Sequence, residues 1–173
     1  MDELTKGKCE SIVSAADPDW TREKCRAYWD PSRRLLRAIR CYQRWKSGGS
    51  LLQWFTGYWV LQHRFWSVVT GADIPLNSQL GGGLLLPHPN GIVIHPAAVI
   101  GPNCLLFQQV TIGNSGRKPG TPVLGGHVDV GAGAKLLGGI TIGDHVKIGA
   151  NAVVLDDVPS GATAVGIPAR VIL

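Results

Sequence analysis

The sequence predicts an α+β fold in which an N-terminal helical segment is followed by a left-handed parallel β-helix of six-residue repeats with an excursion loop. Two observations support this. Aliphatic residues recur every six positions through the second half of the chain, with glycine often following them, and the first part carries helical spacing instead. We therefore expect a helical domain over residues 1–71 and a β-helix domain over residues 72–173.

The helical domain is expected to contain a first helix from about Trp20 to Trp29. Asp30 followed by Pro31 is a good start signal for a second helix, because apolar residues then recur at helical spacing as far as Lys46. A third helical segment, residues 51–70, is crowded with aromatic side chains. Its apolar stretch is too short to span a membrane, so we expect most of these aromatics to be buried in helix packing or a subunit interface rather than in a membrane surface.

Positive charge is concentrated in the same region. Residues 22–46 carry nine Arg or Lys against two acidic residues. This basic face could attract an anionic cofactor, anionic lipid or nucleic acid, but a solvated helix surface is the simpler interpretation. No nucleic-acid-binding motif accompanies it, so no nucleic-acid partner is expected. The four cysteines have no disulfide or metal-ligand spacing and follow no leader, which favours reduced thiols in the cytoplasm.

The repeat begins clearly at Ile94. Counting in sixes, an aliphatic residue occupies every position to Val154 except 118, and a small or β-branched residue follows most of them four positions later. Three such hexads form one triangular coil of about 18 residues whose aliphatic side chains stack inside. Glycines follow the aliphatic positions where a side chain would collide at a corner: Gly101, Gly113, Gly125, Gly131, Gly143 and Gly149.

Two departures from the repeat point to function. Two extra residues lie between Leu86 and Ile94, so the chain is expected to bulge at His88. Residues 114–123 (NSGRKPGTPV) replace a hexad and are expected to leave the prism as a loop. Loops displayed on a rigid scaffold are frequent sites of binding and catalysis.

His88 is a candidate general base, because an imidazole with a pKa of about 6.5 can accept a hydroxyl proton near neutral pH. A turn histidine is the alternative. Asp73 lies about one coil earlier and could orient the imidazole, or could cap a corner. Cys104 falls on an inward position and is expected to serve packing.

No metal site is expected from the remaining histidines. His63 lies in a helical segment, and His95, His127 and His145 occupy exposed positions of separate hexads. They therefore form no ligand cluster.

Residues 73–173 resemble the serine O-acetyltransferases of the hexapeptide acyltransferase superfamily, in a short form. The resemblance rests on Asp73-Ile-Pro, HPNGIVIHPAAVIG, QQVTIG, VGAGAKLLGGITIGDHVKIGANAVVLDDVP and GIPARVI. It implies an acyltransferase that moves acetyl from acetyl-CoA to serine, giving O-acetylserine for cysteine synthesis, by direct attack. It also implies a site between the subunits of a homotrimer, and two trimers could join through the helices.

The resemblance implies roles for particular residues. His88 would take the hydroxyl proton and Asp73 would hold His88, while backbone near Ala132 and Ala150 would contact the pantetheine arm of acetyl-CoA and Arg170 would lie near its phosphates. Near the excursion loop, Arg117 and Thr121 are the candidate substrate-binding residues. Arg117 is the candidate partner of the serine carboxylate, since a guanidinium binds that group bidentately.

Two differences from the family leave the acceptor open. Pro87 stands where the family has an acidic residue that helps to hold the substrate ammonium, and Gly120-Thr121 stands where it has Arg-His. The ammonium must then be met by Asp73 or by an acidic residue of the helical domain. A sugar or polysaccharide hydroxyl is the alternative acceptor, and a noncatalytic β-helix subunit is the alternative function. The sequence ends at Leu173 without the family's flexible tail, so a complex with the next enzyme of cysteine synthesis is expected to be weak or absent.

Overall fold

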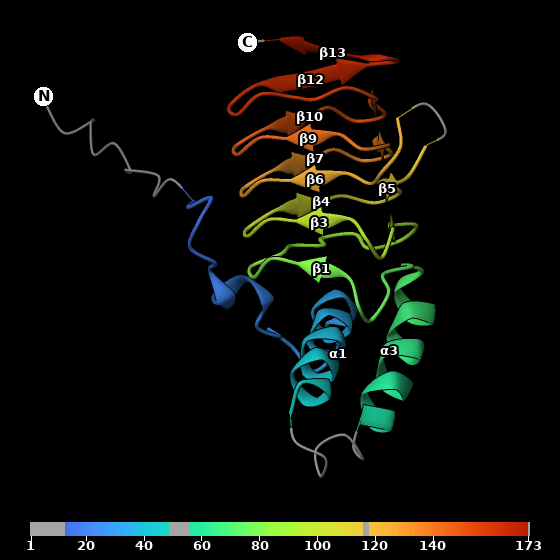
Figure 1. Cartoon of the computed structure of the whole chain (residues 1–173). Coiled ribbons are helices and arrows are strands. Elements are labelled where there is room, and N and C mark those ends of the chain that lie inside the picture. The colour runs from blue at the N-terminus through green and yellow to red at the C-terminus, as the bar shows by residue number, and fades with distance from the viewer. Residues whose placement is uncertain (1–12, 49–55, 116–117, 173) are drawn as a thin grey trace, which may run out of the picture.

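A computed structural model describes residues 13–48, 56–115 and 118–172. Two packed helices lie at one end of a three-sided prism of short strands, and the C-terminal strands lie at the other end (Figure 1). This is the α+β fold predicted from the sequence, a left-handed parallel β-helix preceded by helices. The boundary at residues 71 and 72 remains a prediction, because buried residues of the helices and of the first coil belong to one continuous core.

The predicted first helix is wrong beyond its first turn. Only a 3₁₀ helix, η1 (Trp20–Glu23), forms, and Lys24 already has extended backbone angles. None of the four η1 residues is buried, so little apolar burial favours continuing the turn. By contrast, α1 (Pro31–Lys46) begins and ends where the sequence predicted, with proline in its first turn.

The third predicted helix is α3 (Thr56–Thr70), which packs against α1. The α1 residues that are buried are Leu35, Leu36, Ala38 and Ile39. Of the α3 aromatics, Trp66 is buried and Trp59 is half-buried within the chain, while Tyr58 and Phe65 are exposed on it, so burial of these two in a subunit interface remains a prediction. Trp54 and Phe55 lie outside the described residues. No helix in the described part of the chain is long and apolar enough to cross a bilayer.

The prism has three ladders of stacked strands. One ladder contains β1 (Gln79–Leu80), β3 (Val99–Ile100), β6 (Val123–Leu124) and β9 (Thr141–Ile142). The second contains β4 (Leu105–Leu106), β7 (Asp129–Val130), β10 (Lys147–Ile148), β12 (Thr163–Gly166) and β13 (Ala169–Ile172). The third contains β2 (Val93–Ile94), β5 (Thr111–Gly113), β8 (Lys135–Leu137) and β11 (Val153–Val154). Pairing is parallel except between β12 and β13.

The strand register confirms both departures from the repeat. Val123 pairs with Thr141, 18 positions later, which is one regular coil of three hexads. Gln79 pairs with Val99, 20 positions later, so the first coil holds the two extra residues. Val99 pairs with Val123, 24 positions later, so the second coil holds six extra residues, and the expected loop ends before Val123, which already belongs to β6.

The aliphatic ladders form the core, as the six-residue period predicted. The hexad residues from Ile94 to Val154 are buried, and Cys104 is fully buried among them. This complete burial confirms the expected packing role of Cys104, and it raises the pKa of the thiol to about 11. The expected crowding at glycine corners holds for Gly131, where an added Cβ would lie 2.6 Å from the backbone nitrogen of Ala150. It is wrong for Gly113, where nothing lies within 4 Å.

Candidate active site

One corner of the prism carries three of the candidate site residues, His88, Ala132 and Ala150. Backbone hydrogen bonds stack successive coils there, from Gln109 N to Asn90 O (2.9 Å), Gly133 N to Gln108 O (2.8 Å) and Asn151 N to Ala132 O (2.8 Å). Equivalent positions in successive coils are therefore Asn90, Gln108, Ala132 and Ala150, which we call the His88 edge. The two extra residues of the first coil place His88 just before this edge begins.

The turn at this corner requires left-handed backbone. Gly91, Gln109, Gly133 and Asn151 occupy the same position in successive coils, with φ between 56° and 74°. Glycine and asparagine tolerate this region, whereas glutamine is uncommon there. The turn thus fixes the backbone on which the edge residues sit.

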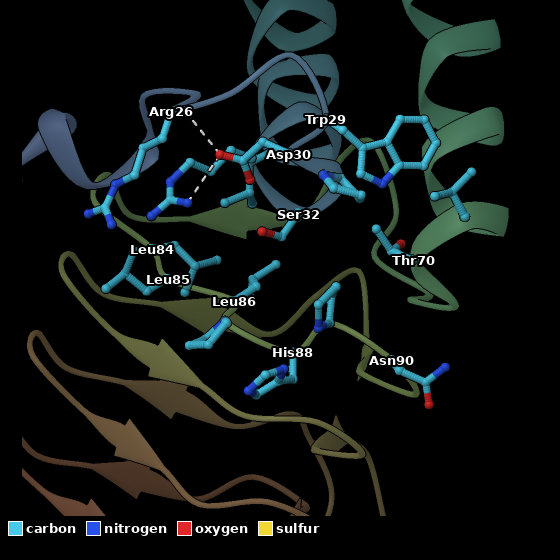
Figure 2. Close-up of a pocket in the computed structure, with 16 residues that line it drawn as sticks. Arg26, Trp29, Asp30, Ser32, Thr70, Leu84, Leu85, Leu86, His88 and Asn90 are labelled. Atoms are coloured by element: carbon cyan, nitrogen blue, oxygen red, sulfur yellow. Dashed lines mark hydrogen bonds and ion pairs between the residues drawn. The ribbon is translucent and has the colours of Figure 1, made fainter.

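A cavity of about 720 Å³ lies beside His88 (Figure 2). Its walls come from the first coil (residues 84–90), from the N-terminal segment and start of α1 (Arg26, residues 29–33 and Leu36), and from the end of α3 (Val69 and Thr70). His88 is solvent-exposed, between two prolines, so its imidazole is accessible from the cavity. This position suits a proton acceptor, and the catalytic role of His88 remains a prediction.

Asp30 is the only acidic residue among those that line the cavity. Its Oδ2 accepts hydrogen bonds from Arg33 Nη1 (3.2 Å) and from the backbone N–H of Arg26 (3.1 Å). Arg33 Nε also donates to the carbonyl of Arg22 (2.9 Å). These bonds fix the carboxylate in the cavity wall, as Figure 2 shows.

Sequence reasoning missed Arg26, Trp29, Asp30 and Ser32 as lining residues. These residues line the same cavity as His88 because the segment before α1 folds back over the first coil. The six-residue period of the sequence gives no information on such an arrangement of distant segments. The start signal at Asp30 is the one local feature that could have drawn attention to them.

Asp73 lies in the ladder of β2, directly opposite Val93 in the next coil. Its backbone bonds to Ile92 O (2.8 Å) and Ile94 N (3.0 Å), while its side chain is exposed. Within the described residues, no hydrogen bond joins the Asp73 carboxylate to His88. The pairing of these two side chains therefore remains a prediction.

The expected acetyl-CoA residues lie along one side of the prism. Ala132 and Ala150 belong to the His88 edge, and Arg170 in β13 pairs with Val165 of β12, beyond Gly149. Neighbouring strands of a sheet lie about 4.8 Å apart, so the stacked coils between the level of His88 and the level of Arg170 extend over roughly 24 Å. Between them, Gln108 Oε1 is buried without a hydrogen-bond partner among the described residues.

Of the two candidate substrate residues near the excursion loop, only Thr121 is described, and it does not line the cavity. Arg117 lies outside the described residues. Thr121 is described, and its hydroxyl donates to the carbonyl of Ala97 (3.0 Å). The neighbouring Lys118 forms an exposed ion pair with Asp157 (3.2 Å), which contributes little because water screens it.

His127 and His145 lie in separate hexads, as expected, but their side chains are adjacent and His127 is only partly exposed. The Nδ1 atoms of His127 and His145 lie 2.8 Å apart, because residues 18 positions apart stack in successive coils. His127 is half-buried, and desolvation lowers the pKa of its imidazole. Within residues 13–48, 56–115 and 118–172, no group of three His, Cys, Asp or Glu side chains could hold a metal ion.

Comparison with known proteins identifies the same family as the sequence motifs. Residues 121–156 match the bacterial transferase hexapeptide (six repeats) family. The serine acetyltransferase of Synechococcus elongatus is 40% identical over 156 residues, which cover 83% of this chain and 63% of that protein. The chain thus spans less than two thirds of this curated relative.

Solved structures show the same similarity. A Neisseria gonorrhoeae serine acetyltransferase in complex with serine is 34% identical with a TM-score of 0.69, covering 84% of this chain and 58% of that one. A serine acetyltransferase in complex with CoA is 33% identical with a TM-score of 0.69, over 84% and 58% of the two chains. The resemblance to serine acetyltransferases predicted from the sequence is confirmed.

Proposed function

We propose that the chain is an acetyl-CoA-dependent O-acetyltransferase whose acceptor is the hydroxyl of serine. The observation that carries this proposal is the position of His88, beside a large cavity and at the start of the edge that contains Ala132 and Ala150. The similar proteins are named serine acetyltransferases, and solved ones carry CoA or serine, which supports both substrates.

In the proposed reaction, neutral His88 accepts the proton of the serine hydroxyl as its oxygen attacks the thioester carbonyl carbon. A C–O bond forms, and the resulting tetrahedral oxyanion expels the CoA thiolate as the C–S bond breaks. The imidazolium then returns its proton to the thiolate, so the products are O-acetylserine and CoA with free His88. Cys104 is not a candidate for a covalent intermediate, because burial raises the pKa of its thiol to about 11 and the thiolate is the nucleophilic form.

The His88 edge fits the pantetheine arm of acetyl-CoA. Ala132 and Ala150 are not buried and carry only methyl side chains. The Oε1 of Gln108, which has no hydrogen-bond partner among the described residues, can accept a hydrogen bond from a pantetheine amide. Arg170 is exposed at the far end and has no ion pair within the described residues, so its guanidinium is available to a phosphate.

The remaining roles complete the proposal. Asp73 orients His88 and stabilises the imidazolium, and Arg117 with Thr121 holds the serine carboxylate. We also propose a homotrimer, with the acetyl-CoA groove between two prisms. Exposed prism faces and strand edges favour such an assembly.

The test is release of free CoA thiol with serine as acceptor, with O-acetylserine identified by mass spectrometry. Serine-dependent thiol release is expected. Absence of turnover with every acceptor tried would contradict the proposal and leave the noncatalytic β-helix subunit.

A sugar hydroxyl is a second candidate acceptor, and the cavity favours it. Its volume of about 720 Å³ lies in the range of pockets for drug-sized ligands, about 300–1,000 Å³, and exceeds what one serine fills. Trp29 is 61% exposed and lines this space, and Pro87 offers no carboxylate to an ammonium. Comparing kcat/KM for serine, homoserine and a panel of sugars separates the two: a far higher value for a sugar overturns the serine assignment.

A further inference from the structure

Helix α3 carries several large apolar side chains on its exposed side, while His63 and Gln62 are half-buried. His63 Nε2 bonds to the carbonyl of Ile74 (2.8 Å), and Gln62 Oε1 accepts from Trp66 Nε1 (3.1 Å). The outward residues, with their exposed fractions, are Tyr58 (56%), Leu61 (65%), Phe65 (51%) and Val68 (84%). Their spacing places them on one side of the helix, which we call the α3 stripe. An apolar partner is needed to cover such a face.

The helical pair is also strongly cationic. No acidic residue occurs between Asp30 and Asp73, whereas this stretch contains seven Arg or Lys. Two of these cations are neutralised, since Arg33 pairs with Asp30 and Arg40 with Glu23. The other exposed cations have no ion pair within the described residues: Arg37, Arg44, Lys46 and Arg64.

These cations lie close to the stripe. Arg64 follows Leu61 by three positions and precedes Val68 by four, so it borders the stripe on α3. Arg37 of α1 lines a small pocket together with Tyr58 and Trp59, which places it on the same side of the helical pair. Arg44 lies two helical turns further along the Arg37 face of α1.

We propose that the α3 stripe and its bordering cations dock onto the surface of an anionic lipid bilayer. Apolar side chains enter the headgroup boundary while Arg and Lys pair with anionic headgroups, the usual combination for a helix that lies in the interface. The helical pair projects from one end of the prism, away from the stacked strands, so it can meet a flat surface (Figure 1). This docking is independent of the proposed acetyl transfer.

Charge favours lipid over a second copy of the same face. A two-fold contact would bring identical patches together, and neither patch has an acidic residue to pair with the opposing Arg side chains. Like charges at such a contact repel, whereas an anionic bilayer neutralises every one of them.

Vesicle flotation with the full chain tests this. Vesicles of phosphatidylcholine mixed with phosphatidylglycerol should bind the protein, more weakly as salt rises, and pure phosphatidylcholine vesicles should not. Replacing Arg44→Gln together with Arg64→Gln should lower binding about fivefold per lost charge. Leu61→Ser with Phe65→Ser should abolish it.

Matched controls change the same residue types on the prism. Lys147→Gln removes an exposed cation of β10, and Ile172→Ser removes a side chain that is 53% exposed in β13. Both should bind vesicles like the wild type, and circular dichroism checks that each variant is folded.

Two results overturn the proposal. One is a wild-type protein that does not bind the mixed vesicles. The other is a loss of binding that is equal for the prism controls and the helical variants. If the wild type ignores vesicles and Leu61→Ser with Phe65→Ser dissociates an assembly in sedimentation, the stripe is a contact between copies of this chain.

Discussion

Replacing Gly131 by alanine tests the stacking of the coils. The added Cβ would lie 2.6 Å from the nitrogen of Ala150 and 2.9 Å from the carbonyl oxygen of Ile148. Both atoms belong to the backbone of the next coil, so neither can move aside without disturbing the ladder. Overpacking of this kind costs about 1–3 kcal/mol of unfolding free energy. For a chain of this size, that corresponds to a fall in Tm of about 2–12 °C.

The matched control is Gly113→Ala, because an added Cβ there meets nothing within 4 Å. Thermal unfolding followed by circular dichroism, at one protein concentration, should show a lowered Tm for Gly131→Ala and little change for Gly113→Ala. Equal Tm values for the two variants would refute the argument that corner clearance selects glycine at position 131.

Three further predictions follow from the site and the core. Cys104 should resist alkylation in the native protein at about pH 8 and react once the chain is unfolded, because burial raises its pKa to about 11; modification at equal rates in both states, measured by mass spectrometry, would be the contrary result. Desolvation holds the folded-state pKa of His127 below its ordinary value of about 6.5, despite the opposing charge of Asp129, so the unfolded chain binds more protons and stability is lost as pH falls below about 6.5. His127→Gln should flatten this loss in Tm measured across that range, and an unchanged pH profile would exclude His127 as its source. Asp73→Asn should lower kcat, but less than loss of His88, if it only orients the base; a KM effect without a kcat effect would place it at the acceptor instead.

The sequence predicted the prism because its core obeys one short local rule. Each coil repeats an aliphatic residue every six positions, so an insertion or a missing repeat can be recognised by counting along the sequence. The extra residues before Ile94 and the hexad missing at position 118 both emerged from counting, and the registers of β1 with β3 and of β3 with β6 confirm them.

The cavity could not be predicted in the same way. Trp29 and Asp30 reach the first coil through contacts between distant segments, and a start signal for a helix says nothing about what its carboxylate will face. The Asp30 Oδ2 accepts hydrogen bonds from Arg33 and from the backbone N–H of Arg26, and the Asp30 side chain does not cap α1. The first predicted helix was wrong for a related reason: Lys24 has extended backbone angles, and Arg26, Trp29 and Asp30 line the cavity beside the first coil instead of continuing a helix.

The outward face of α3 shows that residue composition alone does not predict which side chains are buried. Its aromatic residues suggested burial in helix packing or a subunit interface; within the chain Trp66 is buried, whereas Tyr58 and Phe65 are exposed. Helical spacing identifies which residues share a side, whereas only the packing of α1 decides which side is covered.

The central claim, that His88 is the general base of an acetyl transfer, is tested most directly by the steady-state rate of CoA thiol release from acetyl-CoA for the wild type and His88→Ala. With the acceptor that the wild type uses, we expect kcat to fall about 10²- to 10⁴-fold, with acetyl-CoA binding nearly unchanged by calorimetry. A His88→Ala variant that keeps the wild-type rate would contradict the account.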